Sequence, residues 1–277
     1  MTPPDPGASP FFEVSVPEPP TPVERLLALA ALYTRHNDRI DLLFSGRAHP
    51  DADAYAASAR RLERETLACL KAIRQQRLPP IGLIPSTIVR LKQIAHLTGG
   101  AARYLTAAQQ ALPTEDAKSY RPDRRRGFGQ YVDLARDLTA LASPAIVESA
   151  GHIDRRLRGS ARTTTVTGIG APERDVLLQV ARGHVIAAGQ GERLYRHAVS
   201  VDIETLHSLQ ALHLVTPEPA SAPPLFPGGP TRDRIHLTTL GISALSTVIN
   251  TPDPKPTRSP PLPAPAPGAA GITRTRR

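Results

Sequence analysis

Residues 205–215, TLHSLQALHLV, and residues 234–245, RIHLTTLGISAL, decide the fold of this chain. Leucines recur at helical spacing in the first stretch, so it predicts a helix. The second stretch begins as a strand and continues as another amphipathic helix. Pro and Gly are abundant between the two, over residues 217–230, which predicts a loop. The predicted order is therefore helix, loop, strand and helix.

Both predicted helices are preceded by residues that suit a helix N-cap. Ser200 or Asp202 stands before the first helix, and Thr238 or Thr239 before the second. Short side-chain oxygens at this position accept a hydrogen bond from a free backbone N–H. The residues expected to face inward are Ile203, Leu206, Leu209 and Leu212 in the first helix and Leu240, Ala244, Leu245 and Val248 in the last.

A further helix and a short hairpin are predicted upstream. The helix begins at Ala171, because Pro172 suits a first helical position and Glu173 complements the positive end of the helix dipole. Its apolar pattern stops at Gly183. A short apolar run, a Gly-rich turn and a second apolar pair follow within residues 185–195, and this order predicts a hairpin.

The order of elements from residue 171 to residue 250 resembles the end of many bacterial winged-helix regulators. In that family a recognition helix is followed by a two-stranded wing and a closing helix, which a Leu-Thr pair and a Gly introduce, here Leu237, Thr238 and Gly241. The sequence departs from the family where a hairpin is predicted in place of the first helix of the helix-turn-helix. The resemblance implies DNA binding, with Glu204, His207, Ser208 and Gln210 facing the groove and Arg193, Arg196, Arg232 and Arg234 on phosphates.

Charge argues against a strongly DNA-binding module. Residues 171–250 hold six arginines and seven acidic residues, and the predicted recognition helix has no Arg or Lys. Phosphate neutralisation supplies much of the affinity for duplex DNA, so such a helix binds weakly unless other segments supply cations. The alternative is a scaffold that serves dimerisation or docks another protein through the leucine-rich helix.

The net charge of +9 comes from elsewhere in the chain. Two arginine groups are dense enough to contact a polyanion: Arg124, Arg125 and Arg126 in a predicted turn, and Arg155, Arg156 and Arg158 at a predicted helix end. The alternatives are a solvated loop for the first group and helix capping for the second. The chain also uses many more Arg than Lys, which is typical of a GC-rich genome, so part of the arginine content is background.

Residues 22–158 predict an antiparallel bundle of four or five helices. Two stripes have the stepping of a helix face: Tyr55, Ala59, Leu62, Thr66, Cys69 and Ile73, and then Ile88, Leu91, Ala95, Thr98, Ala102 and Leu105. Ser86 is the expected cap of the second helix, and Gly99 and Gly100 inside it indicate a kink or a close helix contact. The stripes form either an internal core or an interface between copies of the chain.

The remaining segments predict no packed structure. Residues 1–21 and 251–277 are rich in Pro and are expected to be disordered, and residues 159–170 are expected to link the bundle to the winged-helix-like module. No segment is long and apolar enough to span a membrane, and no secretory signal is seen. We therefore expect a cytoplasmic protein whose lone Cys69 packs as a small apolar residue.

No sequence motif indicates an enzyme. The nine histidines and the single cysteine lack the common zinc-site spacings, and neither a phosphate-binding Gly-rich loop nor a nucleophile elbow occurs. We therefore predict a non-enzymatic protein with no catalytic residue, no metal and no cofactor. DNA, another protein or a second copy of the chain are the partners that the sequence leaves open.

Overall fold

The computed structural model describes residues 20–44, 52–76, 82–111, 122–158, 168–187, 201–226 and 228–250. These residues form eight helices and three strands, so the expected mainly helical fold is confirmed. The predicted Pro-rich ends lie outside the described residues, apart from residues 20 and 21, and so does most of the predicted linker. Across the described part of the chain, no helix is both long and apolar enough to cross a membrane.

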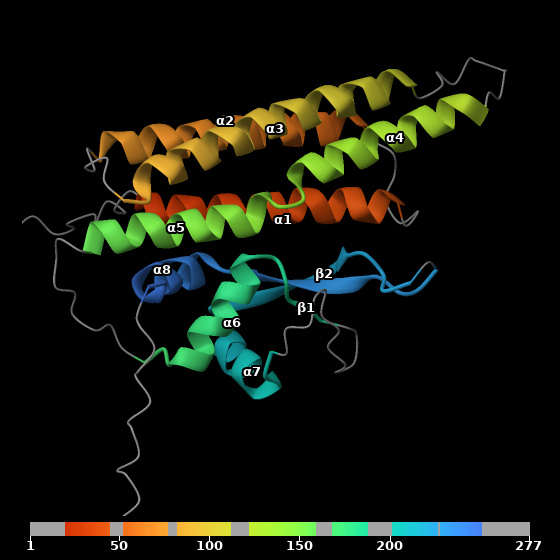
Figure 1. The fold of residues 1–277 in the computed structure, drawn as a ribbon. Coiled ribbons are helices and arrows are strands. Elements are labelled where there is room, and N and C mark those ends of the chain that lie inside the picture. The colour runs from red at the N-terminus through yellow and green to blue at the C-terminus, as the bar shows by residue number, and fades with distance from the viewer. Residues whose placement is uncertain are drawn as a thin grey trace, which may run out of the picture.

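Five helices form the predicted bundle, which is the upper part of Figure 1. Helix α3 packs against α2 on one side and α4 on the other, while α1 packs against α5 and α2. Thr106 of α3 contacts Arg60 of α2, and Thr98 meets Thr66 through Tyr33, so α2 and α3 are antiparallel. The five helices are α1 (Pro22–Phe44), α2 (Ala52–Gln75), α3 (Ile84–Ala111), α4 (Pro122–Thr139) and α5 (Ala142–Arg158).

The predicted stripes of α2 and α3 lie inside the bundle. Every residue of the α2 stripe is buried, and the α3 stripe is buried except at Ile88, which is half-buried. The internal-core interpretation is therefore confirmed for both stripes. Gly99 and Gly100 mark a close contact of helices, because a Cβ at Gly100 would lie 3.2 Å from Leu138 Cδ1 of α4. Helix α3 begins at Ile84, so the prediction of Ser86 as its cap is wrong.

In the residues that the structure describes, the smaller unit consists of three helices and a three-stranded sheet. Strand β3 is central and pairs antiparallel with both β1 and β2. In Figure 1 the sheet lies between α1 above and α6 and α7 below. The elements are α6 (Ala171–Ala181), β1 (Ile186–Ala187), α7 (Ile203–Ala211), β2 (Val215–Ala222), β3 (Arg232–Leu237) and α8 (Thr239–Val248).

Two of the helix caps in this unit are those that the sequence predicts. Asp202 accepts a hydrogen bond from the backbone N–H of Thr205 at the start of α7, and Thr238 accepts one from Gly241 at the start of α8. Each side chain satisfies a backbone donor that the helix itself leaves free.

Three further details of the sequence prediction differ from the observed fold. Residues 217–222 were predicted as part of a loop but continue β2; this is an edge strand, where the missing N–H groups of Pro217 and Pro219 are tolerated. Leu240 was predicted to face inward but is exposed, because it lies in the first turn of α8 beyond the core. Residues 122–126, which include the three consecutive arginines, belong to α4 rather than to a turn.

One hydrophobic core joins the bundle to the smaller unit. It contains Leu26 of α1 and Ile146 of α5 together with Leu177 of α6, Ile235 of β3 and Leu245 of α8. The two parts therefore pack as layers of one body. A second apolar cluster lies within the bundle, around residues of α2, α3 and α4.

Candidate functional site

Helix α7 lies on the side of the smaller unit away from the bundle (Figure 1). Leu206 and Leu209 are buried, which fixes the rotation of the helix about its axis. Of the residues that the resemblance places in a DNA groove, Glu204, His207 and Ser208 are exposed, and Gln210 is half-buried. The structure thus brings these four positions together on one helix of nine residues.

The chemistry of this face is acidic and partly apolar. Helix α7 contains no Arg or Lys, and Asp202 and Glu204 stand at its first turn. Ile203 and Leu212 were predicted to face inward, but they are 43% and 55% exposed. Both lie at the ends of the helix, where the core no longer covers the apolar side.

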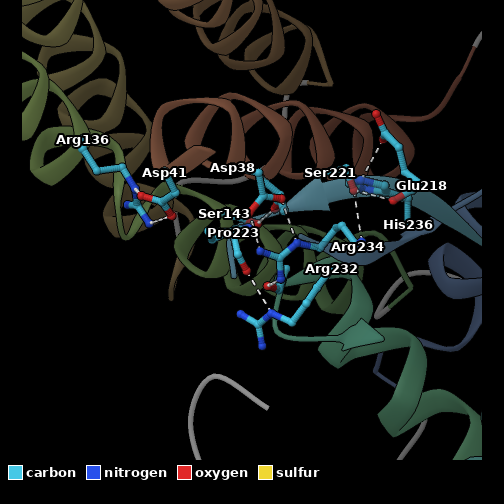
Figure 2. A network of polar contacts seen from close by, with 12 residues as sticks. Asp38, Asp41, Arg136, Ser143, Glu218, Ser221, Pro223, Arg232, Arg234 and His236 are labelled. Carbon is cyan, nitrogen blue, oxygen red and sulfur yellow. Dashed lines mark hydrogen bonds and ion pairs between the residues drawn. The ribbon is translucent and has the colours of Figure 1, made fainter. Parts of the chain in front are cut away.

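The two wing arginines do not point to solvent. Arg232 is buried, and its Nε donates a hydrogen bond to the backbone oxygen of Pro223, 2.8 Å away, across the wing. Arg234 is only 3% exposed and points from β3 toward α1 (Figure 2). The prediction that both side chains extend from the wing toward phosphate is therefore wrong, because both are buried in the fold.

Arg234 instead forms an ion pair with Asp38 across the boundary between the bundle and the sheet. Its Nε donates to Asp38 Oδ2 at 2.8 Å, its Nη2 donates to Asp38 Oδ1, and its Nη1 donates to the backbone oxygen of Gly183 at 2.6 Å. Burial raises the pKa of the Asp38 carboxyl, and the hydrogen bonds from Arg234 only partly offset this effect. The desolvation of the carboxylate therefore outweighs its pairing.

A second, adjacent ion pair lies within the bundle. Arg136 of α4 donates from Nε and Nη2 to the two carboxylate oxygens of Asp41 of α1, at 2.7 Å and 3.0 Å (Figure 2). This is the two-pronged geometry that suits a guanidinium and a carboxylate. Asp38 and Asp41, three residues apart in α1, thus bind arginines from two different elements.

Hydroxyl groups continue the contact between the layers. Thr34 of α1 donates to Ser143 of α5, and Ser143 donates to the backbone oxygen of Ala181 in α6, at 3.1 Å and 3.2 Å. The backbone of Gly183 comes so close that a Cβ there would lie 2.6 Å from Thr34 Oγ1. Gly183 also has a φ of +76°, which favours glycine.

At the other end of the sheet, Glu218 of β2 bridges Arg35 of α1 and His236 of β3. Its Oε2 accepts a hydrogen bond from Arg35 Nε at 3.0 Å and lies 3.0 Å from His236 Nε2, without the alignment of a hydrogen bond in the second case. Burial and the neighbouring Arg35 lower the pKa of His236 to about 4. His236 is therefore neutral at pH 7.

The remaining predicted arginines give no assembled basic surface in the described residues. Arg155 is exposed at the end of α5 and donates to Asn250 Oδ1 at 3.4 Å, and Arg156 is half-buried. Arg193 and Arg196 lie outside the described residues, as do the side chains of Arg124, Arg125, Arg126 and Arg158. The described residues also hold no cluster of His, Cys, Asp or Glu that could bind a metal ion.

Sequence reasoning did not single out Asp38, Asp41 or Arg136. The available signal was the pair of carboxylates three residues apart, a spacing that places both on one face of a helix. Searches against protein families, curated proteins and solved structures find no match to this chain. The functional argument therefore depends on the geometry alone.

Proposed function

We propose that the chain recognises duplex DNA through the exposed face of α7. The single observation behind the proposal is that the bundle covers the sheet but leaves this helix facing outward, with Glu204, His207 and Ser208 exposed. A helix presented in this way fits the major groove, where His and Ser hydroxyl or imidazole groups contact base edges.

The proposal differs from the sequence prediction in its source of positive charge. Arg232 and Arg234 are excluded as phosphate contacts because they are buried. The candidate cations are then Arg193, Arg196 and the basic residues after Asn250. Few phosphate contacts predict a shallow decrease of affinity with salt.

Selection from a random duplex library tests this function. The full chain and a chain cut after Asn250, which keeps every described element, would be compared at two salt concentrations. We expect both to enrich the same sequence. A double variant, His207→Ala with Ser208→Ala, should lower the affinity for that sequence about tenfold or more. The matched control, Gln93→Ala with His96→Ala on the exposed side of α3, should leave it unchanged.

Two results would reject recognition by α7. One is enrichment of no sequence by either chain. The other is salt-sensitive binding that disappears on removal of the residues after Asn250, since this would place the contact in the basic tail alone.

Docking of another protein is the second candidate function. Two exposed apolar side chains, Ile203 and Leu212, stand on the same helix as Asp202 and Glu204, which fits a partner that is basic and partly apolar. The variant Ile203→Ser with Leu212→Ser distinguishes the two functions. It should leave DNA affinity within about twofold if α7 reads DNA through its polar side chains, because apolar contacts carry little of that affinity.

A further inference from the structure

A cleft of about 310 Å³ opens at the boundary between the bundle and the winged-helix-like unit. Its walls come from α1, from α4 and the start of α5, from the turn after α6, and from β3. Parts of the chain that are distant in sequence thus converge on one cavity, a position typical of small-molecule sites. The lining residues that matter to the argument are Asp38, Arg136, Leu141, Arg182 and Arg234.

The charges around the cleft do not balance. Arg234 is paired with Asp38, and Arg136 is paired with Asp41 just behind it. Arg182 also lines the cleft, is half-buried, and forms no ion pair with any residue that the structure describes. Among the residues that line the cleft, the half-buried Arg182 is therefore the arginine without a carboxylate partner. A carboxylate from outside would supply two parallel hydrogen bonds to it.

The mouth of the cleft is apolar beside this cation. Leu141, at the junction of α4 and α5, lines the cleft and is 77% exposed. Ala140 and Pro144 extend the same apolar wall. An apolar group bound here would remove the Leu141 side chain from water, which inorganic phosphate would not do.

We infer that this cleft binds a small organic carboxylate, with Arg182 on the carboxylate and Leu141 against the apolar part of the ligand. The ligand contacts both the bundle and the winged-helix-like unit, so it stabilises their packing. The inference does not depend on DNA recognition by α7, and its test needs no DNA.

Titration calorimetry on the full chain tests the inference. The probes are hexanoate and benzoate, with hexanamide and benzamide as uncharged controls of the same shape and inorganic phosphate as a simple anion. We expect saturable binding of at least one carboxylate and no detectable binding of its amide or of phosphate. A thermal melt with the bound carboxylate should shift upward, because a ligand of the folded state stabilises it.

Three variants assign the binding to the cleft. Arg182→Gln should weaken carboxylate binding about tenfold, because it removes a charge-assisted pair. Arg61→Gln removes the same charge from the exposed side of α2 and should have no effect. Leu141→Gln should weaken the binding of hexanoate severalfold but not that of acetate, which has no apolar tail to cover the side chain.

Four results would overturn the inference. The first is no binding of either carboxylate up to about 10 mM, roughly tenfold above a weak Kd of about 1 mM. The second is binding of the amides as tight as that of the acids, which would remove the role of charge. The third is carboxylate binding by Arg182→Gln as tight as that by the unaltered chain. The fourth is competition by inorganic phosphate at equal affinity, which would indicate a general anion site without specificity for organic acids.

Discussion

Removal of the Asp38 carboxylate should destabilise the protein strongly. Asp38→Asn keeps the size of the side chain but leaves the guanidinium of Arg234 charged, only 3% exposed and without its carboxylate partner. Breaking a buried ion pair from one side costs about 3–5 kcal/mol. A domain of this kind has a total unfolding free energy of about 5–15 kcal/mol, so one substitution would remove a large share of it.

Replacement of both partners should cost much less than replacement of either one. Burial raises the pKa of Asp38 despite the hydrogen bonds from Arg234, so the desolvation of this pair already outweighs its attraction. Apolar residues of similar size, as in Asp38→Leu with Arg234→Met, leave no uncompensated charge. We expect the double variant to recover about 2–4 kcal/mol relative to the sum of the two single variants.

Urea denaturation at pH 7, followed by circular dichroism, measures these free energies. The control is the pair of Arg90 on α3 and Glu148 on α5, whose side chains are 39% and 53% exposed and which should show a coupling of less than about 1 kcal/mol. The reasoning is refuted if Asp38→Asn costs less than about 1 kcal/mol, or if the two substitutions at the buried pair are additive.

Three further predictions concern the interior. Gly241→Ala should destabilise the protein by about 3 kcal/mol, because its Cβ would lie 1.9 Å from the backbone oxygen of Leu214. The control Gly129→Ala meets open space within α4 and should leave the stability unchanged or raise it. Equal urea midpoints for the two variants would contradict this. Burial lowers the pKa of His36 to about 4, so the unfolded chain binds this proton first, and His36 alone should lower the unfolding free energy by about 3 kcal/mol from pH 7 to pH 4, in addition to the contribution of His236. The fall should be smaller in His36→Gln, and an unchanged slope in that variant would assign the effect to other groups. Tyr33→Phe should lower the unfolding free energy by about 1–2 kcal/mol, because the buried phenol hydroxyl forms hydrogen bonds with Thr66 and Thr98 at 3.0 Å and 2.6 Å. An unaltered urea midpoint would show that the two threonines have other hydrogen-bond partners without it.

The sequence was sufficient for features that depend on neighbouring residues. Asp202 and Thr238 cap helices because each needs only the backbone three residues ahead. The apolar stripes of α2 and α3 could be predicted because helical spacing alone decides which side chains share a face. The core of the bundle and the positions of α6, α7, β3 and α8 could therefore be predicted, whereas the predicted hairpin over residues 185–195 lies largely outside the described residues.

The candidate site could not be predicted because its contacts join distant parts of the chain. Arg234 follows Asp38 by 196 residues, and Arg136 follows Asp41 by 95 residues. In the sequence alone, an arginine of β3 looks the same whether its side chain binds a phosphate or the carboxylate of another helix. Only the packing of the sheet beneath α1 decides between these partners.

The same packing changes how the positive charge of this chain should be interpreted. The net charge of +9 suggests an excess of free cations, but Arg35, Arg136 and Arg234 are all paired with acidic residues of other elements. Such arginines hold layers together and contribute little to the attraction of a polyanion. Recognition of DNA by α7 would then depend on shape and base contacts more than on phosphate attraction, so its affinity should be low on random DNA and should rise only on a matching sequence. A chain that bound all duplexes equally well would use its terminal arginines, and α7 would remain a surface for another partner.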